Sequence, residues 1–121
     1  MTTAARASQV HGYYALLSGL MLVVYPHGIA MLGITEPPDP WLRLFGAQAI
    51  GIGVNHLFAS KSNDPVFYRS SVIGRLLFAF IVLIVVILNF GGPSTFLLAA
   101  PDVITALWTI VGLRDLKSAT K

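Results

Sequence analysis

The run LLFAFIVLIVVIL at residues 76–88 contains no charged, polar or glycine residue. Thirteen apolar residues are too few to cross a bilayer, because a spanning helix needs about 20. The flanking sequence extends the run to residues 71–90, SVIGRLLFAFIVLIVVILNF, in which Arg75 near one end is the charged residue. This length and composition predict a membrane-spanning helix.

Three further apolar segments have the same character. They cover residues 10–26, 41–60 and 96–113, and each is followed by a polar or proline- and glycine-rich stretch. After the first segment, Pro26, His27 and Gly28 interrupt the apolar pattern, which resumes at residues 29–34. Proline is tolerated in membrane helices where neighbours satisfy the freed carbonyl. This stretch is therefore either one kinked helix or a span followed by a short interfacial helix, and we favour the second.

The composition of the whole chain agrees with four spans. Its 121 residues are 55% hydrophobic and 11% charged, with a mean hydropathy of +0.76. A soluble domain carries about 25% charged residues, so a soluble enzyme is excluded. Four spans of about 20 residues leave no length for a separate aqueous domain. We expect an all-α fold, an integral membrane four-helix bundle that occupies residues 1–121 as a single domain.

Lysine and arginine fall almost entirely on one side of this four-span arrangement. Arg43 lies on the second side, and the seven on the first side are Arg6, Lys61, Arg69, Arg75, Arg114, Lys117 and Lys121. The positive-inside rule then predicts that both termini are cytoplasmic. These residues stand singly at helix ends rather than in a basic stripe, so we expect no nucleic-acid partner despite a pI of about 9.6. The chain has no cysteine, which excludes disulfides and thiolate chemistry.

Small residues indicate where the helices meet, since lipid supplies no hydrophobic drive between spans. The second span contains Gly46 and two small pairs four residues apart, Ala47 with Gly51 and Ala49 with Gly53. The first span offers Gly12, Ala15 and Gly19 on one face. We interpret these residues as contacts within the chain rather than as a motif for a second chain.

Two polar groups on the outer side predict a contact between the second and fourth spans. Arg43 and Asp102 lie at similar depth in these two spans, so an ion pair is geometrically feasible. It is either a clasp that holds two helices or part of a substrate or proton site. Asp102 is followed on one helical face by Thr105 and Thr109, and Gln48 and Asn55 lie seven residues apart on the second span. We expect all of these side chains to point inward and form a polar seam.

The inner side carries the densest polar cluster, His11, Asn55, His56 and Arg75. As a functional site, His56 is a candidate acid or base, with Asn55 and Arg75 stabilising an oxyanion on a lipophilic substrate. As a structural feature, Arg75 snorkels to lipid head groups and His56 bonds a backbone carbonyl. A bis-histidine haem on His11 and His56 is not favoured, because the pair lacks supporting spacing. We expect no cofactor and no metal.

Several features follow one another in a definite order along the chain. They are a first span ending at Pro26, then Leu32-Gly33-Ile34, Trp41-Leu42-Arg43-Leu44-Phe45-Gly46, Gly53, Gly74-Arg75 and Asp102. This order resembles small four-span bacterial membrane proteins of the DoxX-like kind. The resemblance implies a bacterial inner membrane, and some such proteins are similar to accessory subunits of membrane oxidoreductases. A weaker similarity is to the four-span scaffold protein that gathers sterol-synthesis enzymes. Neither resemblance carries a catalytic residue to this chain.

Three functions remain open at this level. We expect first an accessory or scaffold protein that contacts a membrane-protein partner or a second copy of itself, because packing features are present throughout and a complete catalytic set is not. The alternative is a cofactor-free membrane enzyme or binder for a lipophilic small molecule of isoprenoid, quinone or polyketide class. A small transporter fits less well, because the first span lacks a membrane-embedded acid. Whether the chain is an enzyme stays open.

Overall fold

The computed structural model describes residues 1–34 and 40–119. Over these residues the chain forms four α-helices and two short 3-10 helices, with no β-strand. The α-helices are α1 (Thr3–Val24), α2 (Trp41–Ser62), α3 (Pro65–Ile87) and α4 (Phe96–Ala119). The 3-10 helices are η1 (Pro26–Leu32) and η2 (Pro93–Thr95). The predicted all-α fold is confirmed.

Three helical segments of the described residues are long and apolar enough to cross a membrane, namely Thr3–Val24, Pro65–Ile87 and Pro93–Ser118. This finding is compatible with an integral membrane protein. α2 has a similar length of 22 residues, but Arg43, Gln48, Asn55 and His56 make it less apolar. The fourth span therefore stays a prediction.

Two helices begin earlier than their apolar sequence suggested. α1 begins at Thr3 rather than near residue 10, because Thr2 Oγ1 accepts the Ala5 N–H at 3.1 Å and caps it. α3 begins at Pro65, where Asp64 Oδ1 accepts the Val66 N–H at 2.9 Å. These capped ends are polar or rich in small residues, so hydropathy does not detect them. His11 and Arg75 consequently lie more than two turns inside their helices.

A separate short helix follows α1, as favoured from the sequence. Tyr25 leaves the helical conformation with φ −139° and ψ 75°, and Pro26 starts η1. Gly33 ends η1 at φ 71°, a left-handed conformation that glycine adopts without strain. Ser94 Oγ donates to the Gly33 carbonyl at 2.9 Å and so connects the end of η1 to η2.

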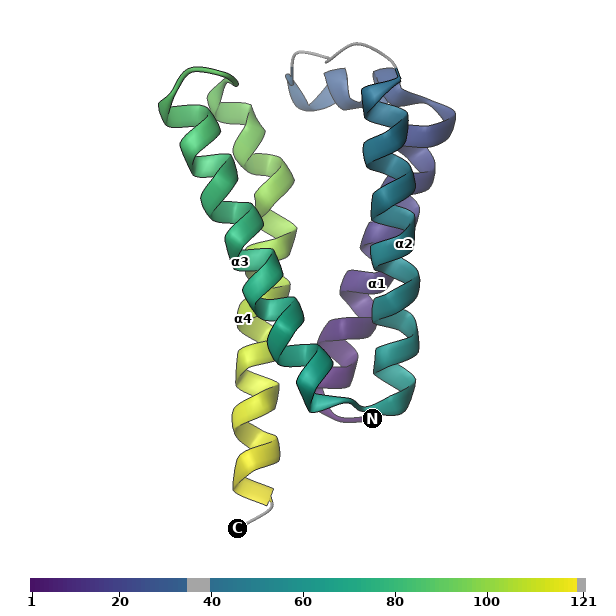
Figure 1. Cartoon of the computed structure of the whole chain (residues 1–121), viewed down its shortest axis with the longest axis vertical. Coiled ribbons are helices and arrows are strands. Elements are labelled where there is room, and N and C mark those ends of the chain that lie inside the picture. Colours follow the sequence, from purple (N-terminus) through teal and green to yellow (C-terminus); the bar gives the residue numbers. More distant parts are fainter. Residues whose placement is uncertain (35–39, 120–121) are drawn as a thin grey trace.

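The helices form two pairs rather than a bundle closed on all sides. α1 packs along α2, α3 packs along α4, and α1 also packs against α4. Figure 1 shows the two pairs meeting at the end where the N-terminus lies and separating towards the other end. α2 and α3 diverge from the turn that joins them (Figure 1).

Glycines allow α1 and α2 to approach closely. A Cβ added at Gly53 would lie 2.7 Å from the Gly12 carbonyl oxygen, and a Cβ at Gly46 would lie 2.7 Å from the Gly19 carbonyl oxygen. The predicted use of small residues for contacts within the chain is confirmed at these four positions. Gly51 is different, since a Cβ there would meet nothing within 4 Å.

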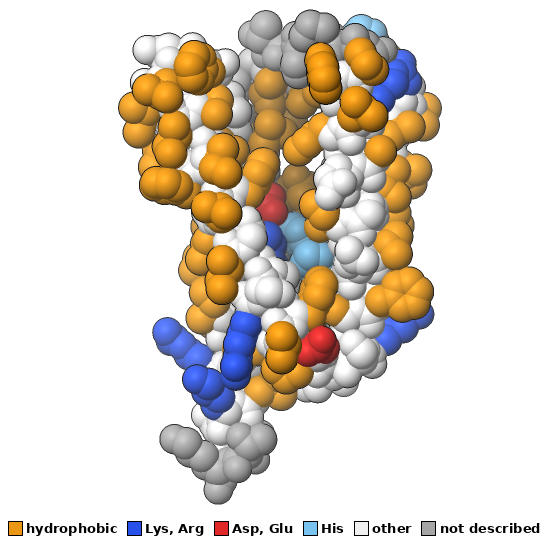
Figure 2. All heavy atoms as spheres, in the orientation of Figure 1, with side chains coloured by type: hydrophobic (Ala, Val, Ile, Leu, Met, Phe, Trp, Pro, Cys, Tyr) orange, Lys and Arg blue, Asp and Glu red, His pale blue; other side chains and the backbone are white. Residues whose placement is uncertain are grey.

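The two ends of the helix pairs each have their own hydrophobic core. Where the pairs meet, Ala4, Ala5, Ala59 and Tyr68 pack together. At the other end Leu22, Ile29 and Leu42 pack together, with Leu98 of α4 against them. Basic side chains gather at the end where the pairs meet (Figure 2). Lys121, part of the predicted charge asymmetry, lies outside the described residues.

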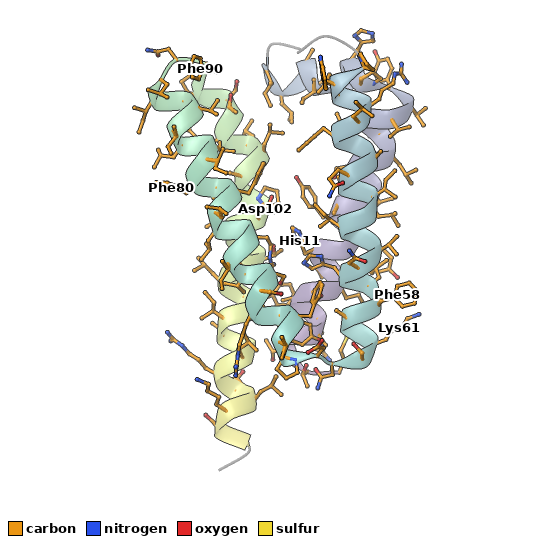
Figure 3. All side chains as sticks on the ribbon, in the orientation of Figure 1. His11, Phe58, Lys61, Phe80, Phe90 and Asp102 are labelled. Carbon is orange, nitrogen blue, oxygen red and sulfur yellow. The ribbon has the colours of Figure 1, made fainter. Side chains whose placement is uncertain are left out.

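The outer surfaces are apolar. Phe58 of α2 and Phe80 of α3 point away from the cleft (Figure 3), and they are 70% and 56% exposed. α3 buries only Tyr68, Val72, Arg75 and Val82 within the described chain. Such faces suit contact with lipid better than contact with water.

Candidate functional site

A cavity of about 490 Å³ lies between the two helix pairs. This volume is in the range of small-molecule sites, which is about 300–1,000 Å³. α1, η1, α2, α3 and α4 all contribute to its walls, which are mainly apolar. Contact between α1 and α4 closes one side of the cavity. Ile29 and Leu32 of η1 line the end of the cavity where the helix pairs are farthest apart. Figure 2 looks into the remaining opening, between α2 and α3.

Each α-helix supplies one His, Arg or Asp side chain to the lining of this cavity. They are His11 from α1, His56 from α2, Arg75 from α3 and Asp102 from α4. The histidines and the arginine are buried, at 2%, 4% and 5% exposure, and the Asp102 side chain is 16% exposed. Burial of four such groups in a mainly apolar cavity costs folding free energy. Their arrangement therefore indicates a functional site.

His11 is held between α1 and α4. Its Nδ1 lies 3.0 Å from Thr105 Oγ1, and its Nε2 lies 3.7 Å from Asp102 Oδ1. The Thr105 hydroxyl donates its single hydrogen to the Pro101 carbonyl at 2.7 Å. His11 Nδ1 is therefore the donor in its bond to Thr105. His11 and Asp102 face one another across the cleft (Figure 3).

Arg75 is held by α3 and α4. Its Nε donates to the Ser71 carbonyl at 3.2 Å, and its Nη2 donates to Ser71 Oγ and Thr109 Oγ1, both at 3.0 Å. The Thr109 hydroxyl donates in turn to the Thr105 carbonyl at 2.8 Å. The structural alternative that Arg75 snorkels to head groups is wrong, because its side chain is buried and bonded inside the protein.

His56 is fixed by its own helix and by aromatic neighbours. Its Nδ1 lies 2.9 Å from the Ile52 carbonyl, which confirms the predicted bond to backbone. Its ring centroid lies 4.6 Å from that of His11 and 5.0 Å from that of Phe67. These contacts hold the ring in place beside the cavity.

Two buried polar atoms of the lining residues are unsatisfied. Within the described part of the chain, His56 Nε2 and Arg75 Nη1 have no hydrogen-bond partner. A buried unsatisfied group costs about 1–3 kcal/mol. Both atoms are inaccessible to water, so this cost opposes the stability of the fold.

Gln48 and Asn55, expected to point inward together, are separated by the structure. Gln48 lines the cavity, whereas Asn55 is exposed and does not line it. Seven residues advance a helix by about 20° less than two turns, and Gln48 already lies at the edge of the cavity-lining face. Asn55 is also about 100° around the helix from His56. The predicted placement of Asn55 beside His56 is wrong for this reason.

The expected ion pair between Arg43 and Asp102 is not formed among the described residues. Arg43 Nη1 donates to the Val23 carbonyl of α1, whereas Asp102 Oδ1 lies 3.7 Å from His11 Nε2. The sequence assigned Asp102 to the outer side and His11 to the inner side. Because α1 begins seven residues earlier than expected, His11 lies deeper in its helix and reaches Asp102.

Ser71 is a site residue that the sequence interpretation missed. Its carbonyl and hydroxyl oxygens accept two of the bonds that orient Arg75. The signal was present in the sequence, because Ser71 precedes Arg75 by four residues and so lies on the same helical face.

The cavity lining does not suit a metal or a bis-histidine haem. Among residues 1–34 and 40–119, no group of three or more His, Cys, Asp or Glu side chains is placed to hold a metal ion. Axial haem ligands stand on opposite faces of the macrocycle, whereas the His11 and His56 rings contact each other directly.

Thr109→Val tests whether the bond between α3 and α4 holds Arg75. Valine keeps the shape of this fully buried side chain but removes the acceptor of Arg75 Nη2. We expect the free energy of unfolding in detergent to fall by about 1–2 kcal/mol. Ser118→Ala on the exposed end of α4 is the control, with an expected change within about 0.5 kcal/mol. Equal changes in the two variants would contradict the assigned bond.

Comparison of this chain with family models, curated proteins and solved structures gave no match. We therefore infer the function of this chain from the geometry of its cavity.

Proposed function

We propose that this chain is an integral membrane protein that binds a lipophilic small molecule in the cavity between its helix pairs. The observation that carries the proposal is a mainly apolar cavity of about 490 Å³ whose lining includes four polar side chains, His11, His56, Arg75 and Asp102. Apolar walls with a few placed polar groups are characteristic of small-molecule sites.

The direction of the opening supports a lipophilic ligand. The cavity opens sideways, between α2 and α3, and the outer surfaces on either side of this opening are apolar. In a membrane such an opening faces the acyl chains. A lipid-soluble molecule can then reach the cavity by lateral diffusion without crossing an aqueous phase.

This proposal includes α2 as a fourth span and cytoplasmic termini. Gln48 and His56 face the cavity rather than the lipid, which reduces the cost of placing α2 in a membrane. Lys61, Arg69, Arg114 and Lys117 lie at the end where the pairs meet, and the positive-inside rule assigns that end to the cytoplasm. A bacterial inner membrane is the location that the DoxX-like resemblance suggests.

The accessory or scaffold role remains the second candidate. The exposed apolar face of α3 is compatible with a partner helix, but it is equally compatible with lipid. The cavity instead combines burial and charge at one position. We therefore favour ligand binding over the accessory role. A ligand-binding cavity is also compatible with the alternative of a cofactor-free enzyme.

The proposal is tested by purifying the tagged protein from its native membrane in mild detergent. Mass spectrometry of the organic extract should find one lipophilic compound near a 1:1 ratio with the protein. Arg75→Met should lose most of this compound, whereas Arg69→Met, at an exposed arginine of the same helix, should retain it. A stoichiometric membrane-protein partner without any enriched compound would instead support the accessory role.

A further inference from the structure

We propose that the cavity takes a lipophilic carboxylic acid, which gives its proton to Asp102 and stays bound as an anion. This inference depends on the proposed function and narrows it to one ligand class. Two observations support it, namely the facing acceptor atoms of His11 and Asp102 and the positive charge of Arg75 in the same cavity.

His11 and Asp102 present two acceptor atoms to each other (Figure 3). His11 Nδ1 donates its hydrogen to Thr105 Oγ1 at 3.0 Å, so Nε2 of the neutral ring carries a lone pair. An ionised Asp102 has acceptor oxygens only, and its Oδ1 lies 3.7 Å from His11 Nε2. Two acceptors repel each other in a medium of low dielectric constant, whereas one added proton makes them attract. The pair is therefore a binding site for one proton.

Asp102 connects this proton site to the cavity. It lines the cavity and its side chain is 16% exposed, whereas His11 is 2% exposed. An acid group of a bound molecule can therefore reach the Asp102 carboxylate. In the transfer the O–H bond of the ligand breaks, its electron pair stays on the ligand oxygen, and the proton binds Asp102. The new carboxyl group of Asp102 is neutral, as an apolar cavity favours, and His11 Nε2 is the acceptor that faces it.

The charges of the cavity favour this exchange. The titratable and charged groups that line the cavity with Asp102 are His11 and Tyr14 of α1, His56 of α2 and Arg75 of α3. Arg75 lies close enough to Asp102 for their charges to interact. Protonation of Asp102 leaves Arg75 without this opposing charge, and the ligand carboxylate then supplies it. Uptake of the neutral acid from lipid thus leaves the net charge of the cavity unchanged, which avoids the cost of burying an additional charge.

Difference infrared spectroscopy shows which group holds the proton. Dodecanoic acid, labelled with carbon-13 at its carboxyl group, is added to the unaltered protein in nanodiscs, so that ligand and protein bands are separate. On binding we expect a labelled carboxylate band together with the carbonyl band of a newly protonated carboxyl group in the protein. Methyl dodecanoate has no acidic hydrogen, so it should bind at least about tenfold more weakly and leave the protein band absent.

Two variants assign the proton to Asp102. Asp102→Asn removes the acceptor carboxylate, so the protein band should disappear. With dodecanoate added as its salt at about pH 8, proton uptake should fall from about one per bound ligand in the unaltered protein to near zero in this variant. Asp115→Asn, at an exposed residue of the same helix, should keep both the band and the proton uptake.

Two results would overturn the inference in different ways. A bound ligand that stays protonated, or a protein in which no carboxyl group gains a proton, would reject the proton transfer and leave the lipophilic site in place. Absence of saturable binding of dodecanoic acid would reject the ligand class, and the compound in the native extract would then decide the proposed function separately.

Discussion

Gly53→Leu should lower the free energy of unfolding in detergent micelles by more than about 3 kcal/mol. A Cβ at this position would lie 2.7 Å from both the Gly12 carbonyl oxygen and the Leu16 backbone nitrogen. These are backbone atoms, so α1 and α2 must separate to accept any side chain. Within a membrane the close packing of helices replaces the hydrophobic effect as a source of stability, and its loss is therefore severe.

Gly51→Leu is the matched control for this prediction. Gly51 lies on the same helix two residues earlier, but a Cβ there would meet nothing within 4 Å. Leucine also has a higher helix propensity than glycine. We expect a change within about 0.5 kcal/mol, or a small stabilisation, in the same unfolding titration. If both leucine variants lost the same stability, the assigned α1–α2 interface would be incorrect.

Gly74→Phe should block the cavity without unfolding the protein. Gly74 lies on α3, lines the cavity beside Arg75, and has open space where a Cβ would stand. A phenyl group can therefore occupy the space that the ligand would use. Native mass spectrometry of the purified protein should show at least a tenfold loss of the bound compound, with an unchanged unfolding midpoint.

Ile73→Phe provides the comparison for this second change. Ile73 is the preceding residue of α3 and is 67% exposed, so its side chain points elsewhere. This variant should retain the bound compound at the level of the unaltered protein. Full retention of the compound in Gly74→Phe would contradict binding between α2 and α3.

Hydropathy alone predicted the helices and the order in which they occur. Residues 76–87 of the apolar run lie within α3 and Leu88 is its C-cap, and the interruption at Pro26 marks the start of η1. These features were predictable because apolar runs and proline act locally along the chain. The sequence also predicted that Gly46 and Gly53 lie at a helix interface, since small residues mark helix interfaces in membranes.

The grouping of the site residues was not predictable in the same way. The sequence separated Asp102, Thr105 and Thr109 from His11 and Arg75. The structure joins Arg75 to Thr109 and His11 to Thr105 by hydrogen bonds, and Asp102 Oδ1 lies 3.7 Å from His11 Nε2. The cause is the start of α1 at Thr3, where an N-cap and small residues extend the helix beyond its apolar run. A shift of seven residues moves a side chain by about 10 Å along a helix.

The separation between the two helix pairs also could not be predicted from the sequence. Patterns of small residues show that a helix has a close partner, but they do not show which faces remain apart. α2 and α3 separate because the glycine contacts of α2 are directed at α1 and α3 packs on α4. The cavity arises from this combination, and no single segment encodes it.

The most direct test is a crystal structure, grown in a lipidic mesophase, of the protein purified from its native membrane. We expect elongated density between α2 and α3, in contact with the cavity-lining residues His56 and Arg75. A structure in which α2 and α3 close against each other, or in which the cavity holds only water, would contradict it.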